Sequence, residues 1–101
     1  MIGAILRDYD PLAFLPGGRW ERILDACVGA NRPLTRRELR DAAGSGNHPV
    51  PVERAKILRA TRNMARAGLL QRVALPDGVG AFEVTRAGYQ ALVQNAGHRA
   101  A

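Results

Sequence analysis

The sequence predicts a small α+β domain that is mostly helical, with a three-helix core, a two-stranded β-hairpin and a C-terminal helix. Two periodicities support this prediction. Apolar residues recur at helical spacing in three segments, 18–29, 35–43 and 51–68. They alternate with a period of two in residues 70–75 and 81–85. The chain has 101 residues, of which 47% are hydrophobic and 24% charged, as expected for one globular domain.

The two ends of the chain are expected to lie outside this domain, which covers residues 18–95. Residues 1–17 should form an N-terminal arm, because Pro11 and Pro16 interrupt any long helix. The arm is too apolar for a free tail, so it packs on the domain or contributes to dimerisation. Residues 96–101 are expected to be a flexible tail.

The first helix, residues 18–29, carries a continuous apolar stripe and is expected to end at Gly29, before Pro33. The stripe is formed by Trp20, Ile23, Leu24, Cys27 and Val28. We interpret Trp20 as a core anchor and Cys27 as a small buried residue. Because Cys27 is the only cysteine, an internal disulfide is impossible, and a reducing cytoplasm is the expected compartment.

The second helix, residues 35–43, begins with Thr35 and Glu38 at the spacing of a capping box. We expect Leu39, Ala42 and Ala43 to face inward. The cationic side chains of this helix, which should stay outside, are Arg36, Arg37 and Arg40.

The third helix, residues 51–68, has an apolar and a cationic side. Pro51 suits its first turn, Glu53 complements the helix dipole, and Gly68 provides a C-terminal stop. One arc should be buried and contains Ile57, Leu58, Thr61, Met64, Ala65 and Gly68. The opposite arc should face outward and contains Lys56, Arg59, Arg62, Asn63 and Arg66.

The last part of the chain is predicted to be a hairpin followed by a helix. Asp77 and Gly78 indicate the turn. We expect Arg72 and Glu83 to share one side of the hairpin and to pair across the strands. Thr85 then caps the last helix, whose apolar side is formed by Tyr89, Leu92 and Val93.

The net charge of +6 is concentrated in the middle of the chain. Residues 1–34 hold four arginines and four acids, whereas residues 35–68 hold seven arginines, one lysine and three acids, a net charge of +5. Residues 69–101 hold three arginines and two acids. A localised cationic surface of this kind indicates phosphate binding.

The sequence offers no pattern for catalysis, metal or cofactor binding, or membrane insertion. His48 and His98 lie far apart, and no set of histidine, cysteine and acidic residues converges by spacing. The apolar runs are too short to span a membrane. We therefore expect a cytoplasmic protein that is not an enzyme, with no metal, cofactor or small-molecule ligand.

Three sequence segments occur in an order that resembles the winged helix-turn-helix family of DNA-binding regulators, broadly its MarR-like and PadR-like groups. They are the segments PLTRREL at 33–39, MARAGLL at 64–70 and FEVTRAGYQAL at 82–92. The resemblance covers about residues 18–95 and implies a DNA-binding domain whose hairpin is the wing.

The resemblance implies that the third helix enters the major groove of double-stranded DNA. Arg59 and Asn63 would then read bases, and Lys56 would read a base or clamp the backbone. The implied phosphate contacts are Arg36, Arg37, Arg40, Arg62, Arg66 and Arg72. The implied function is sequence-specific DNA binding by a transcriptional regulator, as a homodimer that uses the N-terminal segment and the terminal helix.

A second hypothesis is that the chain is a phage or plasmid accessory factor, a winged-helix module that binds an acidic protein without reading DNA. The tip of the wing, residues 76–80, favours it, because it carries Asp77 and no arginine or lysine. The charge of residues 35–68 favours DNA.

Overall fold

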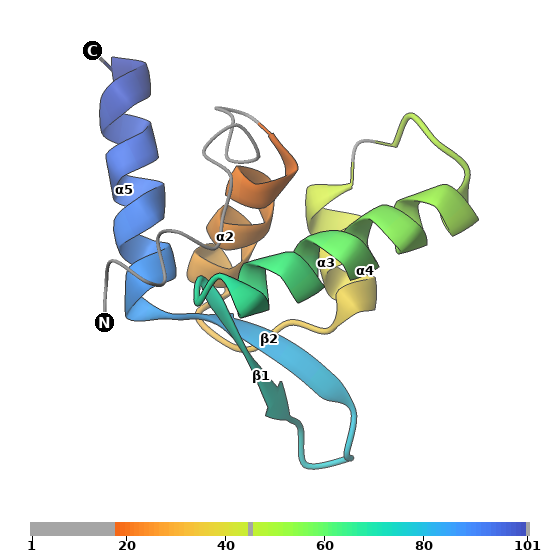
Figure 1. Cartoon of the computed structure of the whole chain (residues 1–101). Helices are drawn as coiled ribbons and strands as arrows, with labels where there is room; N and C mark the ends of the chain where they lie inside the picture. The colour runs from red at the N-terminus through yellow and green to blue at the C-terminus, as the bar shows by residue number, and fades with distance from the viewer. Residues whose placement is uncertain (1–17, 45, 101) are drawn as a thin grey trace.

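The helices and strands follow the predicted order. The structure is a computed structural model that describes residues 18–44 and 46–100. Within these residues the elements are α2 (Arg19–Ala30), α3 (Arg36–Ala43), α4 (Val50–Arg66), β1 (Leu70–Ala74), β2 (Gly80–Val84) and α5 (Arg86–Ala100) (Figure 1). The prediction of a small, mostly helical α+β fold with one antiparallel hairpin is confirmed. The expected arm, residues 1–17, lies outside the described residues.

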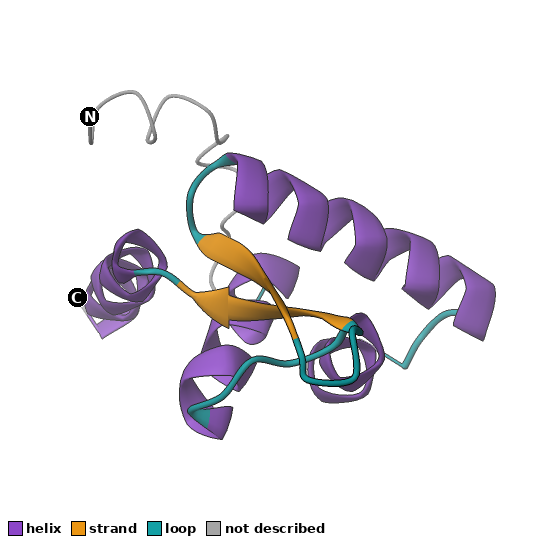
Figure 2. Cartoon of the chain, turned by 90° about the horizontal axis from the view of Figure 1, so that it is seen from below, coloured by secondary structure: helices purple, strands orange, loops and turns teal. Residues whose placement is uncertain are grey.

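The elements are arranged with the hairpin beside a helical body. Helix α3 packs against both α2 and α4, while β1 contacts α4 and β2 contacts α2. The hairpin extends to one side of these helices, and α5 lies at the far end from the start of α4 (Figures 1 and 2). Helix α5 is attached through α2 and β2. This arrangement leaves α3, α4 and the hairpin as neighbours.

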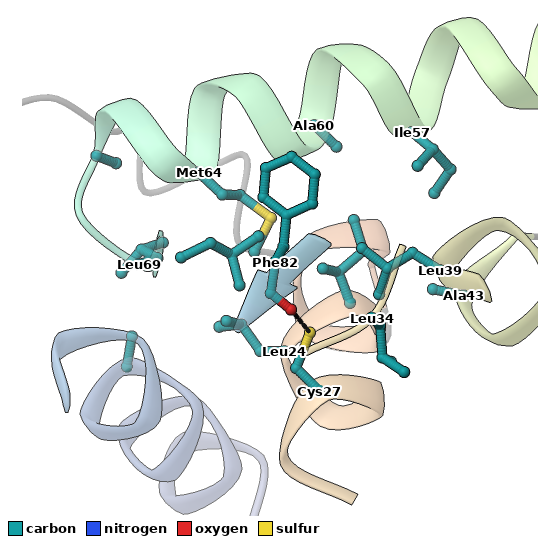
Figure 3. Close-up of a cluster of buried hydrophobic side chains, with 14 residues drawn as sticks. Leu24, Cys27, Leu34, Leu39, Ala43, Ile57, Ala60, Met64, Leu69 and Phe82 are labelled. Atoms are coloured by element: carbon teal, nitrogen blue, oxygen red, sulfur yellow. Dashed lines mark hydrogen bonds between the residues drawn. The ribbon is translucent and has the colours of Figure 1, made fainter. Parts of the chain in front are cut away.

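The core lies between the helices and the inner side of the hairpin. Phe82, on β2, sits among side chains from α2, α4 and the segment that follows α4 (Figure 3). Leu24, Met64 and Leu69 are fully buried around it. Cys27 is buried as predicted, and its burial raises the pKa of the thiol to about 11. Trp20 is only partly buried at the edge of this core.

Local signals determine where the helices begin and end. The predicted capping box is present, because Glu38 N donates to Thr35 Oγ1 (3.2 Å) and Thr35 N donates to Glu38 Oε1 (3.1 Å). Gly68 follows α4 with a φ of +83°, as expected of a glycine stop. Helix α2 ends later than predicted, because Asn31 rather than Gly29 adopts the left-handed conformation (φ 53°). Asparagine is one of the few residues that tolerate it.

The register of the hairpin differs from the prediction. Arg72 lies opposite Phe82, and Glu83 lies opposite Gln71, whose side-chain amide donates to it. The predicted Arg72–Glu83 pair is therefore wrong. The turn sets this register, because Leu75 N donates to Val79 O (2.9 Å). A shift of one residue exchanges the two sides of a strand.

Two further contacts fix the hairpin to the helices. Leu34, before α3, forms a β-bridge with Phe82, through bonds of 2.9 and 2.8 Å. Directly after β2, Thr85 caps α5, because Gly88 N donates to Thr85 Oγ1 (3.0 Å). The hairpin is thus attached to the helices at the middle of β2 and just after its last residue.

Helix α5 differs from the prediction in length and orientation. It continues to Ala100, although a tail was expected from residue 96. Of its predicted apolar side, Leu92 packs against the core, whereas Tyr89 and Val93 are 52% and 53% exposed. The helix turns Gly88 toward the body instead, and this glycine approaches the backbone of Leu69 closely.

Candidate nucleic-acid interface

Helix α4 is oriented by a buried stripe that runs its whole length. The stripe consists of Glu53, Ile57, Ala60, Thr61 and Met64. Leu58 was predicted to belong to it but is 36% exposed, so that prediction is wrong. The stripe is centred on Ile57 and Met64, about two turns apart, and this rotates Leu58 toward the surface beside α3.

The start of α4 is fixed by a buried acid. Glu53 is 5% exposed, and its carboxylate lies 3.6 Å from Nη2 of Arg19 at the start of α2. A carboxylate in the first turn also faces the positive end of the helix dipole. Besides its predicted interaction with the helix dipole, Glu53 therefore also connects α4 to α2.

Four arginines line a groove between α3 and α4. Its volume is about 520 Å³, and Ile57 and Leu58 form its apolar part. The arginines are Arg36, Arg37, Arg40 and Arg54. Sequence reasoning assigned no role to Arg54. Arg54 lies four residues before Leu58 and eight before Arg62, so it shares their flank of α4. The sequence could indicate this position only if Leu58 were expected on the surface.

A second groove joins α3 to the hairpin. It has a volume of about 490 Å³ and is lined by Arg36, Arg37 and Arg72, together with residues of the hairpin turn. Because Arg36 and Arg37 also line the first groove, the two grooves form one cationic surface. We call it the arginine face and define it as Arg36, Arg37, Arg40, Arg54, Arg62 and Arg72.

Arg36 is held rigidly at the centre of the arginine face. Its Nε donates to Thr61 Oγ1 on α4 (3.1 Å), and its guanidinium lies 4.9 Å from the centre of the Phe82 ring. Partial burial, and then the nearby charges of Arg72 and Arg62, lower the pKa of Arg36. Arginine nevertheless stays protonated in proteins. Three positive charges therefore lie close together where α3, α4 and β1 meet.

Little negative charge balances this surface. Within the described part of the chain, Arg40 is the only member of the arginine face with a carboxylate inside 4.0 Å, and that acid is its neighbour Asp41 at 3.8 Å. The other two acidic side chains of α3 and α4 pair outside this surface, since Glu38 pairs with Arg32 (2.6 Å) and Glu53 with Arg19. The arginine face thus projects an uncompensated positive potential.

The predicted base-reading residues lie on the other flank of α4. Lys56, Arg59 and Asn63 line a third groove, of about 710 Å³, together with Arg19 and Trp20 of α2. Arg59 is exposed, whereas Lys56 and Asn63 are half-buried, and Lys56 Nζ lies 2.9 Å from Nε2 of His48. Arg66, a predicted phosphate contact, is exposed in the last turn of α4.

The structure therefore places eight of the nine predicted site residues in two groups, and Arg66 belongs to neither. The arginine face brings together five of the six predicted phosphate contacts, which come from α3, α4 and β1. The three predicted base readers form a second group toward α2. Only the outer surface of α4, where Arg59 and Arg62 are exposed, adjoins both groups.

The described part of the chain shows no cluster of metal-binding side chains and no membrane-spanning helix. No group of three or more histidine, cysteine or acidic side chains among them could hold a metal ion. None of the described helices combines the length and the apolar character needed to cross a membrane.

Comparisons with known proteins add no assignment. The chain matches no protein-family model, and neither the curated proteins nor the solved structures contain a significant match.

Proposed function

We propose that this protein binds double-stranded DNA sequence-specifically and acts as a transcriptional regulator, with α4 in the major groove. The observation that carries the proposal is the arginine face. Its six arginines, from α3, α4 and β1, lie on or beside the outer surface of α4, and almost no acidic side chain balances their charge. A helix fits the major groove, and guanidinium groups on its flanks reach the phosphates that border the groove.

Affinity would come mainly from the arginine face. Each arginine that neutralises a phosphate releases condensed counterions, so binding weakens steeply as salt is added. Site choice would come from α4. Arg59 is the most exposed of the three predicted base readers, and Arg54 and Arg62 extend the same helix surface toward α3. Lys56 and Asn63 would contribute from the flank that faces α2.

A salt titration tests this proposal. The full chain is titrated against a fluorescently labelled random-sequence duplex at several salt concentrations. With six or more phosphate contacts, affinity should fall about 10³-fold or more between 50 and 200 mM salt. The control variant Arg86→Ala removes one exposed positive charge that lies outside the arginine face. It should leave the dependence of affinity on salt concentration nearly unchanged. Absence of binding at low salt would contradict the proposal.

The alternative is a module that binds an acidic protein segment through the same surface. The tip of the hairpin favours it, because Asp77 and the 47% exposed Val79 lie where a DNA-binding wing would benefit from a cation. The salt titration separates the two functions. A protein module would bind an acidic peptide and show no micromolar affinity for a duplex.

A further inference from the structure

Two arginines from different elements meet beside one aromatic ring. Arg36 of α3 lies over Phe82, and Arg72 of β1 is directly opposite Phe82 in the strand register. Both line the groove of about 490 Å³ between α3 and the hairpin, and Arg37 lines it as well. Folding thus brings together guanidinium groups that repel one another.

Arg36 is fixed by one atom and presents the rest of its guanidinium. Thr61 Oγ1 donates to the carbonyl of Ile57 (2.8 Å), which orients a lone pair toward Nε of Arg36. Among the described residues, Nε is the only atom of this guanidinium with a hydrogen-bond partner. The Nη groups remain available to an acceptor. Because Thr61 is fully buried, its geometry does not depend on the solvent.

Arg72 occupies space that a glycine leaves open. A Cβ built at Gly80 would lie 3.0 Å from both Nε and Nη2 of Arg72. The Arg72 side chain therefore crosses the neighbouring strand at the one position of β2 without a side chain. A Cβ at position 80 would require this flexible guanidinium to shift by a few tenths of an ångström, and a larger side chain would displace it further.

An anion with several oxygens suits this arrangement. Guanidinium groups bind phosphate through paired N–H donors, and two or three of them around one phosphate replace repulsion with attraction. The one acid lining this groove is Asp77, in the hairpin turn, and its Oδ1 already accepts from Val79 N (3.0 Å). Within the described part of the chain, Asp77 forms no ion pair within 4.0 Å with Arg36, Arg37 or Arg72.

We propose that the groove between α3 and the hairpin is a preformed site for one phosphate group, bound by Arg36, Arg37 and Arg72. If the phosphate is a backbone phosphodiester of duplex DNA, this inference rests on the proposed function. A free phosphate offers the same chemistry. In the duplex, this site fixes the position of the hairpin on the backbone next to the groove that α4 enters, although the hairpin tip has no cation.

The arginine side-chain NMR signals test the site directly. The Nε–Hε signals of the full chain are followed while inorganic phosphate replaces chloride at constant ionic strength, and then during titration with a short duplex. We expect the signals of Arg36 and Arg72 to shift and saturate in both titrations, and that of Arg86 to stay. Signals of Arg36 and Arg72 that move no more than that of Arg86 in both titrations would overturn the proposal.

Two variants that retain every charged residue distinguish the effect of preorganisation from the effect of charge alone. Thr61→Val removes the acceptor that holds Arg36, and Gly80→Val places a branched side chain where the Arg72 guanidinium lies. Each should weaken duplex binding about tenfold, as for one charged hydrogen bond lost. Unchanged binding by both folded variants would overturn the site. If the duplex binds and the Arg36 signal does not move, the phosphate site is refuted but the DNA function is not. If phosphate binds and the duplex does not, the phosphate site is supported and the DNA function is refuted.

Discussion

Arg36 illustrates how a single residue connects the fold to the proposed function. It lies in the first turn of α3, contacts Thr61 of α4 and stacks on Phe82 of β2. The sequence predicts an exposed Arg36 that touches phosphate. Its two supports could not be predicted, because they depend on how α4 and the hairpin pack against α3. Packing converts a mobile arginine into one with a fixed direction, which lowers the entropy lost on binding.

At the residue scale, the base readers can be tested one at a time. Arg59→Ala and Asn63→Ala should each alter site preference and cost about 1–3 kcal/mol at a cognate site selected from random duplexes. Their affinity for non-cognate DNA should change much less. Because Asn63 is half-buried beside α2, we expect Arg59→Ala to have the larger effect. Identical losses on cognate and random DNA would refute base reading by these residues.

Glu38 gives the chain a defined acid sensitivity. Hydrogen bonds from the side chain of Arg32, and then from Thr35 N, lower the pKa of its carboxyl from 4.5 to about 2. A lowered pKa in the folded state stabilises the fold above the ordinary carboxyl pKa, and this contribution is lost as the pH falls toward 2.

We therefore expect Glu38→Gln to be less stable than the parent chain at pH 6. The two should converge as the pH falls to 2 and below, because the Glu38 carboxyl then becomes protonated in the folded state as well. Urea unfolding at several pH values measures this difference. A gap that stays constant from pH 6 to pH 2 would contradict the assigned role of the Glu38 carboxylate.

At the scale of elements, the junction between the hairpin and α5 depends on Gly88. A Cβ at this position would lie 2.1 Å from the carbonyl oxygen of Leu69, so either the backbone or the helix must move. Gly88→Ala should lower the free energy of unfolding by about 2–4 kcal/mol.

A second glycine provides the matched control for that substitution. Gly29 lies inside α2, and a Cβ there would meet nothing within 4 Å. Gly29→Ala should stabilise the chain by roughly 0.5–1 kcal/mol, because alanine favours the helix. Thermal unfolding of both variants measures the contrast. Equal effects would refute the close approach at Gly88.

The elements also show which features the sequence could predict. Local chemistry predicted the capping box at Thr35 and the stop at Gly68, because each depends on a few neighbouring residues. The exposure of Leu58 and the register of Arg72 were mispredicted. Both depend on how one element is rotated or shifted against another. Apolar spacing alone determines that rotation or shift only to within a residue or two.

The same limit applies to the site. The resemblance implied five of the six arginines of the arginine face as phosphate contacts. Local spacing had already placed four of them on the outer sides of α3 and α4, and the fifth, Arg72, lies on the hairpin. Arg54 was missed because the buried stripe of α4 was centred too near Leu58. The separation of Lys56 and Asn63 from the arginine face could not be predicted, since it depends on where α2 packs.

At the scale of the whole molecule, the proposed homodimer has candidate contacts on α5. Tyr89 and Val93 are one turn apart and more than half exposed, at the end of the molecule opposite the start of α4 (Figure 1). If α5 forms the dimer contact, Val93→Asp should raise the dimer dissociation constant at least tenfold. Sedimentation analysis measures this. A chain that stays monomeric at high concentration would refute the homodimer.

Hydrogen exchange with and without a duplex tests the central claim most directly, since it maps the bound surface on the whole chain. The account predicts added protection in α4, in the start of α3 and in the hairpin, with α5 and the second half of α2 unchanged. This pattern follows the arginine face and the outer surface of α4. Protection confined to α2 and α5, or no change in exchange while the duplex is bound, would contradict the account.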